Sequence, residues 1–165
     1  MQQNNPIADD VQSKASGLVG GCQCGALRYH ISGEPITVYV CHCKDCQKQA
    51  ASAFGMSLWT GSTNFQLTRG DLSFYQTHGD SGAFKKCAYC QQCGTRIYHT
   101  SAQPGAVLSV KAGSLDDTSL LRPIAHLWTC RAQPWAGIDC EKMACFETEP
   151  PDDQVLIDLW RNANP

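Results

Sequence analysis

The cysteines of this chain concentrate in three short motifs whose spacing suits a metal ion. Two are the pairs Cys22-Gln-Cys24 and Cys90-Gln-Gln-Cys93, and the third is the trio Cys41-His-Cys43-Lys-Asp-Cys46. Gly94 follows the second pair and relaxes the backbone, so that both sulfurs can meet one ion. Side chains two residues apart on a strand point to the same side, and the first pair can therefore converge as well. The motifs predict thiolate–zinc chemistry.

The seven cysteines divide into a set of four and a set of three. A structural zinc takes four protein ligands, and the two pairs supply them: Cys22, Cys24, Cys90 and Cys93. The remaining trio offers three ligands and one exchangeable position, which is the arrangement of a catalytic zinc. We therefore expect a second zinc whose open position receives a substrate, such as a thiol bound as thiolate, at Cys41, Cys43 and Cys46.

Two residues near these motifs offer alternative ligands. His42 could complete the trio's site and close it, but neighbouring side chains of an extended segment point in opposite directions. We expect His42 to hydrogen-bond the backbone or to line the site. Cys87 could replace Cys90, although Gly94 favours the pair Cys90 and Cys93.

Three cysteines have no tight metal spacing: Cys130, Cys140 and Cys145. Buried free thiols behave as small apolar side chains, and this is the role that we expect for all three.

The bulk composition limits the class of function. A chain of 165 residues fits one domain, and its net charge of −2 gives no electrostatic basis for binding nucleic acid or an anionic membrane. No apolar run approaches the roughly 18 residues of a membrane span, and the first residues lack the pattern of a secretory signal. The count of eleven cysteines is odd, so a fully paired disulfide framework explains it poorly. We expect a cytoplasmic protein.

Short segments rich in β-branched and aromatic residues predict a mainly antiparallel β domain with little helix. They are residues 26–33, 35–40, 55–60, 64–70, 72–77, 95–100 and 106–113. One helix is predicted over residues 45–54 with Asp45 as its cap. After Asp152, apolar residues at helical spacing indicate a short helix docked on the domain or on a second subunit or, alternatively, a frayed tail. The expected units are a disordered lead-in (1–19), the zinc-stapled β domain (20–148) and a C-terminal tail (149–165).

The order of the motifs resembles the glutathione-dependent formaldehyde-activating enzyme family (GFA domain), to which centromere protein V is related. The matching stretches, between about Gly20 and Trp135, are GGCQCGALRY, VCHCKDCQKQAASAF, FQLTRGDLSFY, YCQQCGTRIY and HLWTCRAQPW. The resemblance implies a zinc-bearing β-tent (Mss-four-like) fold, with a structural zinc at the set of four and a more labile zinc at the trio. It also implies a carbon–sulfur lyase reaction, run in reverse, that joins glutathione to formaldehyde to give S-hydroxymethylglutathione.

The chain departs from the family pattern in places that leave the zinc ligands untouched. The family places a glycine in the helix after the third trio cysteine, where this chain has Gln49-Ala50-Ala51. It places an arginine and a phenylalanine before the second pair, where this chain has Ala88-Tyr89, with Lys85 and Lys86 a little earlier. These differences concern the substrate contacts.

Glutathione carries two carboxylates, which need cationic or backbone donors. The candidate cations are Lys44, Lys48, Arg69, Lys85 and Arg96. The family-like tail motif adds candidates for the pocket wall, although core packing explains the two tryptophans equally well: His126, Trp128 and Trp135. The expected partners are a small thiol and a small aldehyde, without nucleic acid or membrane. The oligomeric state stays open, with a homodimer as one option.

Two other functions use a related fold. If His42 or another protein ligand closes the trio's site, the domain is a non-catalytic zinc-binding interaction module. A redox repair enzyme like methionine sulfoxide reductase B shares the fold and a four-cysteine zinc but needs a separate nucleophilic cysteine. Neither Cys130 nor Cys140 has neighbours in the sequence that would activate it. The favoured hypothesis is a zinc-dependent thiol–aldehyde reaction.

Overall fold

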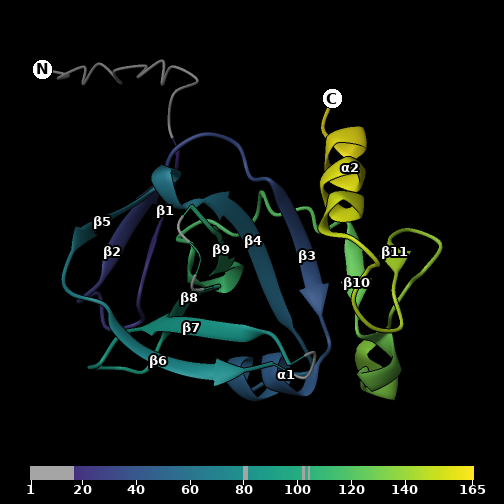
Figure 1. Cartoon of the computed structure of the whole chain (residues 1–165), viewed down its shortest axis with the longest axis horizontal. Helices are drawn as coiled ribbons and strands as arrows, with labels where there is room; N and C mark the ends of the chain where they lie inside the picture. Colours follow the sequence, from purple (N-terminus) through teal and green to yellow (C-terminus); the bar gives the residue numbers. More distant parts are fainter. Residues whose placement is uncertain (1–16, 80–81, 102, 104) are drawn as a thin grey trace, which may run out of the picture.

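The structure, a computed structural model that describes residues 17–79, 82–101, 103 and 105–165, is built around two β-sheets. The smaller sheet has the order β1-β2-β5, with β1 Leu18–Gly21, β2 Arg28–Ile31 and β5 Phe65–Arg69. The larger sheet has the order β11-β10-β3-β4-β9-β8-β7-β6 (Figure 1). Its strands are β3 Thr37–Cys41, β4 Gly55–Gly61, β6 Ser73–His78, β7 Phe84–Tyr89, β8 Arg96–Thr100, β9 Val107–Lys111, β10 Ala125–Leu127 and β11 Ala144–Cys145.

The mainly β prediction is confirmed, and each of the seven predicted segments contains a strand. Four further strands were not predicted: β1, β7, β10 and β11. β1 is half glycine, β7 carries two lysines, and β10 and β11 are only three and two residues long. The pairing is mainly antiparallel, as predicted, except at one edge, where β10 runs parallel to both β3 and β11.

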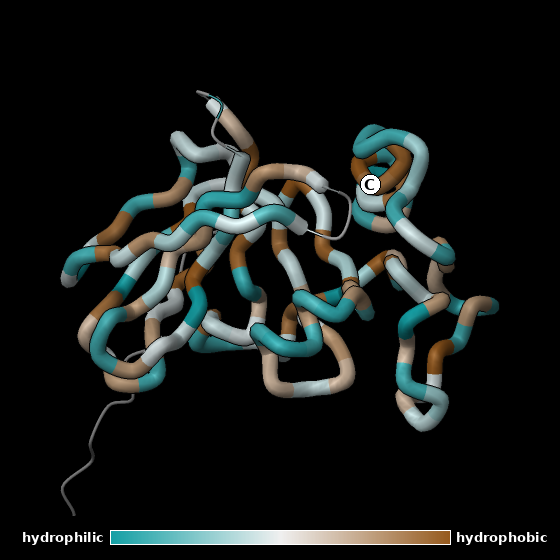
Figure 2. The backbone as a smooth tube through the Cα atoms, turned by 60° about the horizontal axis from the view of Figure 1, so that its bottom comes forward, coloured by the Kyte–Doolittle hydropathy of each residue, from teal (hydrophilic) through white to brown (hydrophobic). Residues whose placement is uncertain are grey.

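Apolar side chains fill the space between the two sheets. Tyr29 and Ile31 of β2, Leu58 of β4, Ile97 of β8 and Val110 of β9 are all fully buried there. Burial of each such side chain stabilises the folded state by about 1.5–3 kcal/mol. This hydrophobic burial is the main force that holds the two sheets together. Figure 2 shows hydrophobic stretches along the strands and along part of the C-terminal helix.

The opposite face of the larger sheet is polar, because side chains alternate along each strand. Cross-strand partners share a face, and the pairing joins Tyr39, Ser57 and Lys111 in one row. A second row on the same face joins Trp59, Ser109, His99, Cys87 and Tyr75. This face therefore carries hydroxyl, imidazole, amine and thiol groups from β3 to β6.

Helix α1 (Lys44–Ala50) follows β3 almost directly. The predicted helix is present, but its predicted cap is wrong: Cys43 is the N-cap, and its Sγ accepts a hydrogen bond from the Cys46 amide at 3.4 Å. Asp45 lies instead in the first turn, where the helix dipole favours a carboxylate. The helix ends four residues before the predicted residue 54, because Ala51 adopts a left-handed backbone with φ 48°.

Helix α2 (Asp153–Ala163) is the C-terminal helix that the sequence predicts. The Asp152 side chain caps it, accepting from the Gln154 amide at 2.8 Å. Leu156 is buried in the same apolar cluster as the trio, and its carbonyl accepts from the Thr37 hydroxyl at 3.2 Å. The prediction of a docked helix is therefore confirmed, and the alternative of a frayed tail is wrong.

Short 3-10 turns connect several elements: η1 Ser62–Asn64, η2 Ala112–Ser114, η3 Thr129–Arg131 and η4 Pro134–Ala136. Residues 1–16 of the predicted lead-in lie outside the described residues, whereas Leu18 and Val19 already belong to β1. The strand thus begins two residues before the predicted domain boundary. In the part of the chain that the structure describes, neither helix has the length and apolar character needed to cross a membrane.

Candidate metal centre and its cavity

The trio lies where strand β3 passes into helix α1. Cys41 ends β3, Cys43 caps α1, and Cys46 lies in its first turn. The change from extended to helical backbone brings the three sulfur atoms within 4.8 Å of one another. All three residues are buried.

Three thiols this close together cannot ionise independently. Hydrogen bonds from Cys41 and Cys46 hold the pKa of Cys43 far below its usual value, and the same contact with Cys43 raises the pKa of Cys41. The trio therefore carries one negative charge readily, and full ionisation needs a cation among the sulfurs. A soft divalent ion such as Zn²⁺ fits this donor set.

His42 does not turn toward the trio. Its Nε2 lies 3.0 Å from Nδ1 of His126, and burial lowers the pKa of both imidazoles. Among the described residues, no histidine or carboxylate is grouped with the three sulfurs. The trio is therefore a set of three, and the imidazole of His42 is engaged by the His126 side chain.

The two cysteine pairs also come together. The sulfurs of Cys22, Cys24, Cys90 and Cys93 all lie within 4.8 Å of one another. The Leu27 amide donates to Cys22 Sγ at 3.1 Å, and hydrogen bonds from Thr95 lower the pKa of Cys93 to about 5. Gly94 has φ 74°, a left-handed conformation that costs glycine little, and its amide donates to the Cys90 carbonyl at 2.8 Å. The set links the β1–β2 turn to the β7–β8 turn.

The other four cysteines have different environments. Cys87 is fully buried in β7 and belongs to neither set. The prediction of three buried apolar thiols is wrong. Cys130 is exposed in η3, while Cys140 and Cys145 form a disulfide across a turn in which their Cα atoms lie 5.5 Å apart. The turn before β11 brings these two residues within disulfide reach, which their sequence spacing alone does not reveal.

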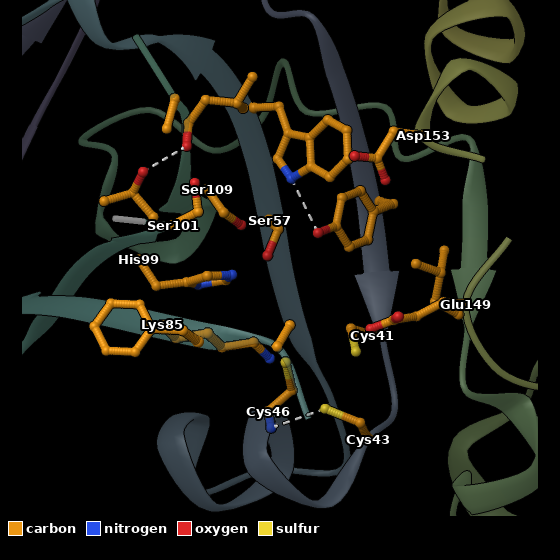
Figure 3. A pocket seen from close by; sticks show the side chains of 18 of the residues that line it. Cys41, Cys43, Cys46, Ser57, Lys85, His99, Ser101, Ser109, Glu149 and Asp153 are labelled. Carbon is orange, nitrogen blue, oxygen red and sulfur yellow. Dashed lines mark hydrogen bonds between the residues drawn. The ribbon is translucent and has the colours of Figure 1, made fainter. Parts of the chain in front are cut away.

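A cavity of about 630 Å³, the front cavity, opens beside the trio (Figure 3). All three trio cysteines line it. Lys85 and His99 reach into it from β7 and β8, and Glu149 approaches from the other side. The wall is completed by hydroxyl, aromatic and acidic residues: Ser57, Ser101, Ser109, Tyr39, Trp59, Trp128 and Asp153.

Two of these polar residues have unusual electrostatic environments. Burial, reinforced by the positive charges of Lys111 and Lys85, holds the pKa of His99 well below its usual value. His99 is thus a neutral imidazole at physiological pH. The Ser109 hydroxyl is buried and has no hydrogen-bond partner within the described residues. The front cavity therefore presents neutral donors close to a cluster that attracts cations.

The residues predicted to contact the substrate do not all lie at one site. Lys85 and Trp128 line the front cavity, whereas Arg96 lines a second cavity on another side of Cys46. Lys44 and Lys48 are exposed on α1, Arg69 donates to the Gly25 carbonyl, and Trp135 is 75% exposed. His126 pairs with His42 and is not among the residues that line the front cavity.

Sequence reasoning missed several residues of the front cavity. His99, Ser57 and Ser109 come from three different strands and share a face only through the cross-strand register. The alternation within TRIYHT and VLSVK was visible, but the face that points to the trio was not. Glu149 and Asp153 reach the cavity because α2 docks on β3.

The sequence pattern of the glutathione-dependent formaldehyde-activating enzyme family matches residues 17–131, more than half of the chain. The chain belongs to this family. Residues 132–165, which include β11, the disulfide and α2, lie outside the match. No curated protein matches the chain significantly. A crystal structure of a Rhodobacter sphaeroides protein is similar at 20% identity, covering 64% of this chain and 92% of that chain with a TM-score of 0.48.

Proposed function

We propose that this protein is a zinc-dependent carbon–sulfur lyase that joins a small thiol to a small aldehyde. Its substrates are glutathione and formaldehyde, and its product is S-hydroxymethylglutathione. The observation that supports this best is the convergence of the three trio sulfurs at the wall of a cavity, with no fourth ligand group among the described residues. A three-ligand set leaves one position for an exchangeable ligand.

Cys41, Cys43 and Cys46 are the residues that would hold the catalytic zinc. When bound, the ion would supply a Lewis acid that lowers the pKa of an incoming thiol. The set of Cys22, Cys24, Cys90 and Cys93 provides four thiols, which suits a closed structural site. His42, one ligand that could close the trio's site in an interaction module, is engaged by His126, and no other histidine or carboxylate of the described residues is grouped with the trio; both observations favour the enzyme.

The residues around the front cavity suit the bond changes. In the addition, the thiolate sulfur forms a bond to the carbonyl carbon, and the carbonyl oxygen takes up the proton that the thiol has lost. The unpartnered Ser109 hydroxyl and the neutral His99 imidazole are donors that can stabilise the developing negative oxygen. The amine of Lys85 points toward the sulfurs and favours an anionic thiolate there (Figure 3).

Much of the rate enhancement follows from placing the two reactants together. Thiol and aldehyde combine slowly without help, so a site that holds both beside the trio removes part of the entropic barrier. The aromatic rings of Tyr39 and Trp59, joined by a hydrogen bond of 3.0 Å, form a firm wall for this purpose.

The test measures zinc content and turnover in Cys43→Ser. Wild-type protein should bind two zinc ions per chain and accelerate the exchange between free formaldehyde and S-hydroxymethylglutathione, followed by carbon-13 exchange spectroscopy. The variant should keep its circular dichroism spectrum, lose one zinc and fall to the uncatalysed rate. Cys130→Ser, an exposed cysteine outside both sets, is the matched control and should retain both properties. Normal turnover in Cys43→Ser would refute the proposal.

A further inference from the structure

A second cavity of about 830 Å³, the rear cavity, lies between the end of α1, the turn around Gly94 and the end of β9. Cys46 borders this cavity as well as the front one. The cations of its lining are Arg96 and Lys111; no carboxylate of the described residues lines it, and the cysteines that border it are Cys46 and Cys93. The front cavity differs, because its wall includes Glu149 and Asp153.

Arg96 has hydrogen-bonding capacity that the protein does not use. Its Nη1 donates to the Tyr75 hydroxyl, and its guanidinium stacks on the Tyr75 ring at 4.7 Å. Nε and Nη2 are buried without a partner among the described residues. These two nitrogens form one edge of the guanidinium, the fork that binds a carboxylate through two parallel hydrogen bonds. Leaving such donors unpaired is costly, so an anionic partner is expected.

Lys111 adds a second cation beside Arg96. It ends β9 on the polar face of the larger sheet and is only partly exposed. No carboxylate forms a salt bridge with it in the described part of the chain. Two clustered cations on the wall of a cavity, with no carboxylate partner among the described residues, are an arrangement that attracts an anion.

We infer that the rear cavity binds a carboxylate of the thiol cosubstrate, an inference that rests on the proposed function. The anionic thiol then approaches the trio from the rear cavity, and the uncharged aldehyde approaches from the front cavity. Gly55 supports this path: it lines the rear cavity, and a Cβ there would lie 3.7 Å from Cys46 Sγ. The absence of a side chain keeps space open between the rear cavity and the trio.

The competing explanation is that Arg96 and Lys111 only offset the negative charge of the two metal–thiolate clusters. That role predicts changes in zinc retention without changes in ligand binding. The two explanations differ in what the cations contact, and a binding measurement separates them.

The experiment titrates zinc-loaded protein with S-methylglutathione in a calorimeter. This probe keeps both carboxylates but has no free thiol, so binding does not depend on the trio or on turnover. Arg96→Gln and Lys111→Met should each weaken binding about tenfold or more, because a charge-assisted contact is lost. Lys48→Gln, an exposed lysine of α1 outside both cavities, should bind like the wild type.

Arg96→Lys keeps the charge but not the fork, and it guards against misfolding of the glutamine variant. The Arg96→Lys variant should also bind S-methylglutathione more weakly than the wild type. Equal binding in all variants, no binding by the wild type, or zinc loss with unchanged binding would each overturn the inference. Wild-type protein that catalyses the exchange without binding the probe refutes the rear cavity alone. Protein that binds the probe through Arg96 without catalysing the exchange refutes the proposed function alone.

Discussion

His42 and His126 form a buried pair in which Nε2 of the first ring lies 3.0 Å from Nδ1 of the second. His42 stands between Cys41 and Cys43, and His126 lies in β10, the parallel neighbour of β3. The pair therefore fastens the segment that carries the trio to an adjacent strand. His126 acts on the trio through His42 and is a positioning residue.

Removing His126 should destabilise the protein. In His126→Leu the buried Nε2 of His42 loses its partner, and an unsatisfied buried polar group costs about 1–3 kcal/mol. Urea unfolding of the zinc-loaded protein measures this loss, and the trio's zinc should dissociate faster on addition of a chelator. His78→Leu, at an exposed position of β6, is the control and should change stability by less than about 0.5 kcal/mol. Equal effects in the two variants would argue against a structural role for the pair.

Neighbouring lysines of β7 offer a test of the charge in the front cavity. Lys85 lines that cavity, whereas Lys86 lies on the opposite face of the sheet with its Nζ 4.3 Å from the centre of the Phe74 ring. Lys85→Met should slow the exchange reaction roughly tenfold at neutral pH, because a thiolate near the trio loses a nearby positive charge. Lys86→Met removes the same charge from the chain but should leave the rate unchanged. If the exchange rate decreased equally in both variants, the rate would depend on the net charge of the chain and not on the position of the lysine.

The metal ligands could be predicted from the sequence because their spacing is local. Two residues between Cys90 and Cys93, with Gly94 next, fix a turn that brings the sulfurs together wherever it occurs. The front cavity could not be predicted, because Ser109 and His99 meet only through the register of β8 and β9. The alternation of residues along a strand assigns its side chains to two faces, but it does not show which of the two faces lies toward α1.

Other failures have equally physical reasons. Strand β7 went unpredicted because its two lysines hide the alternation, although one of them serves the cavity. The parallel pairing of β10 with β3 depends on a long connection that no short motif encodes. The disulfide between Cys140 and Cys145 lies in the region beyond the family match, where the metal spacing gave no information.

Removing that disulfide should cost stability without affecting the metals. In the double variant Cys140→Ser and Cys145→Ser, release of a loop of this size lowers the free energy of unfolding by about 2 kcal/mol in the chain-entropy account. Urea unfolding under non-reducing conditions measures the change, and zinc content should stay at the wild-type value because neither residue belongs to a cysteine set. Reducing the wild type with a phosphine, which has no thiol to bind the metal, should reproduce the loss, whereas the double variant should not respond. A variant as stable as the oxidised wild type would show that the bridge contributes nothing.

His99 should make the stability depend on pH in a defined direction. In the folded chain, burial and the nearby cations keep its pKa well below 6.5, whereas in the unfolded chain the imidazole titrates at its ordinary value near 6.5. Below that pH the unfolded state binds more protons than the folded state, so stability falls as pH falls, by at most about 1.4 kcal/mol per pH unit. His99→Gln removes this titration. The stability of the variant relative to the wild type should therefore rise between about pH 6.5 and 5.5, while between about pH 7.5 and 6.5 it stays nearly constant. Urea midpoints of the two proteins give the comparison, and acid loss of metal largely cancels because both keep the same seven cysteines. Parallel pH curves would mean that His99 is protonated as easily in the fold as in the open chain.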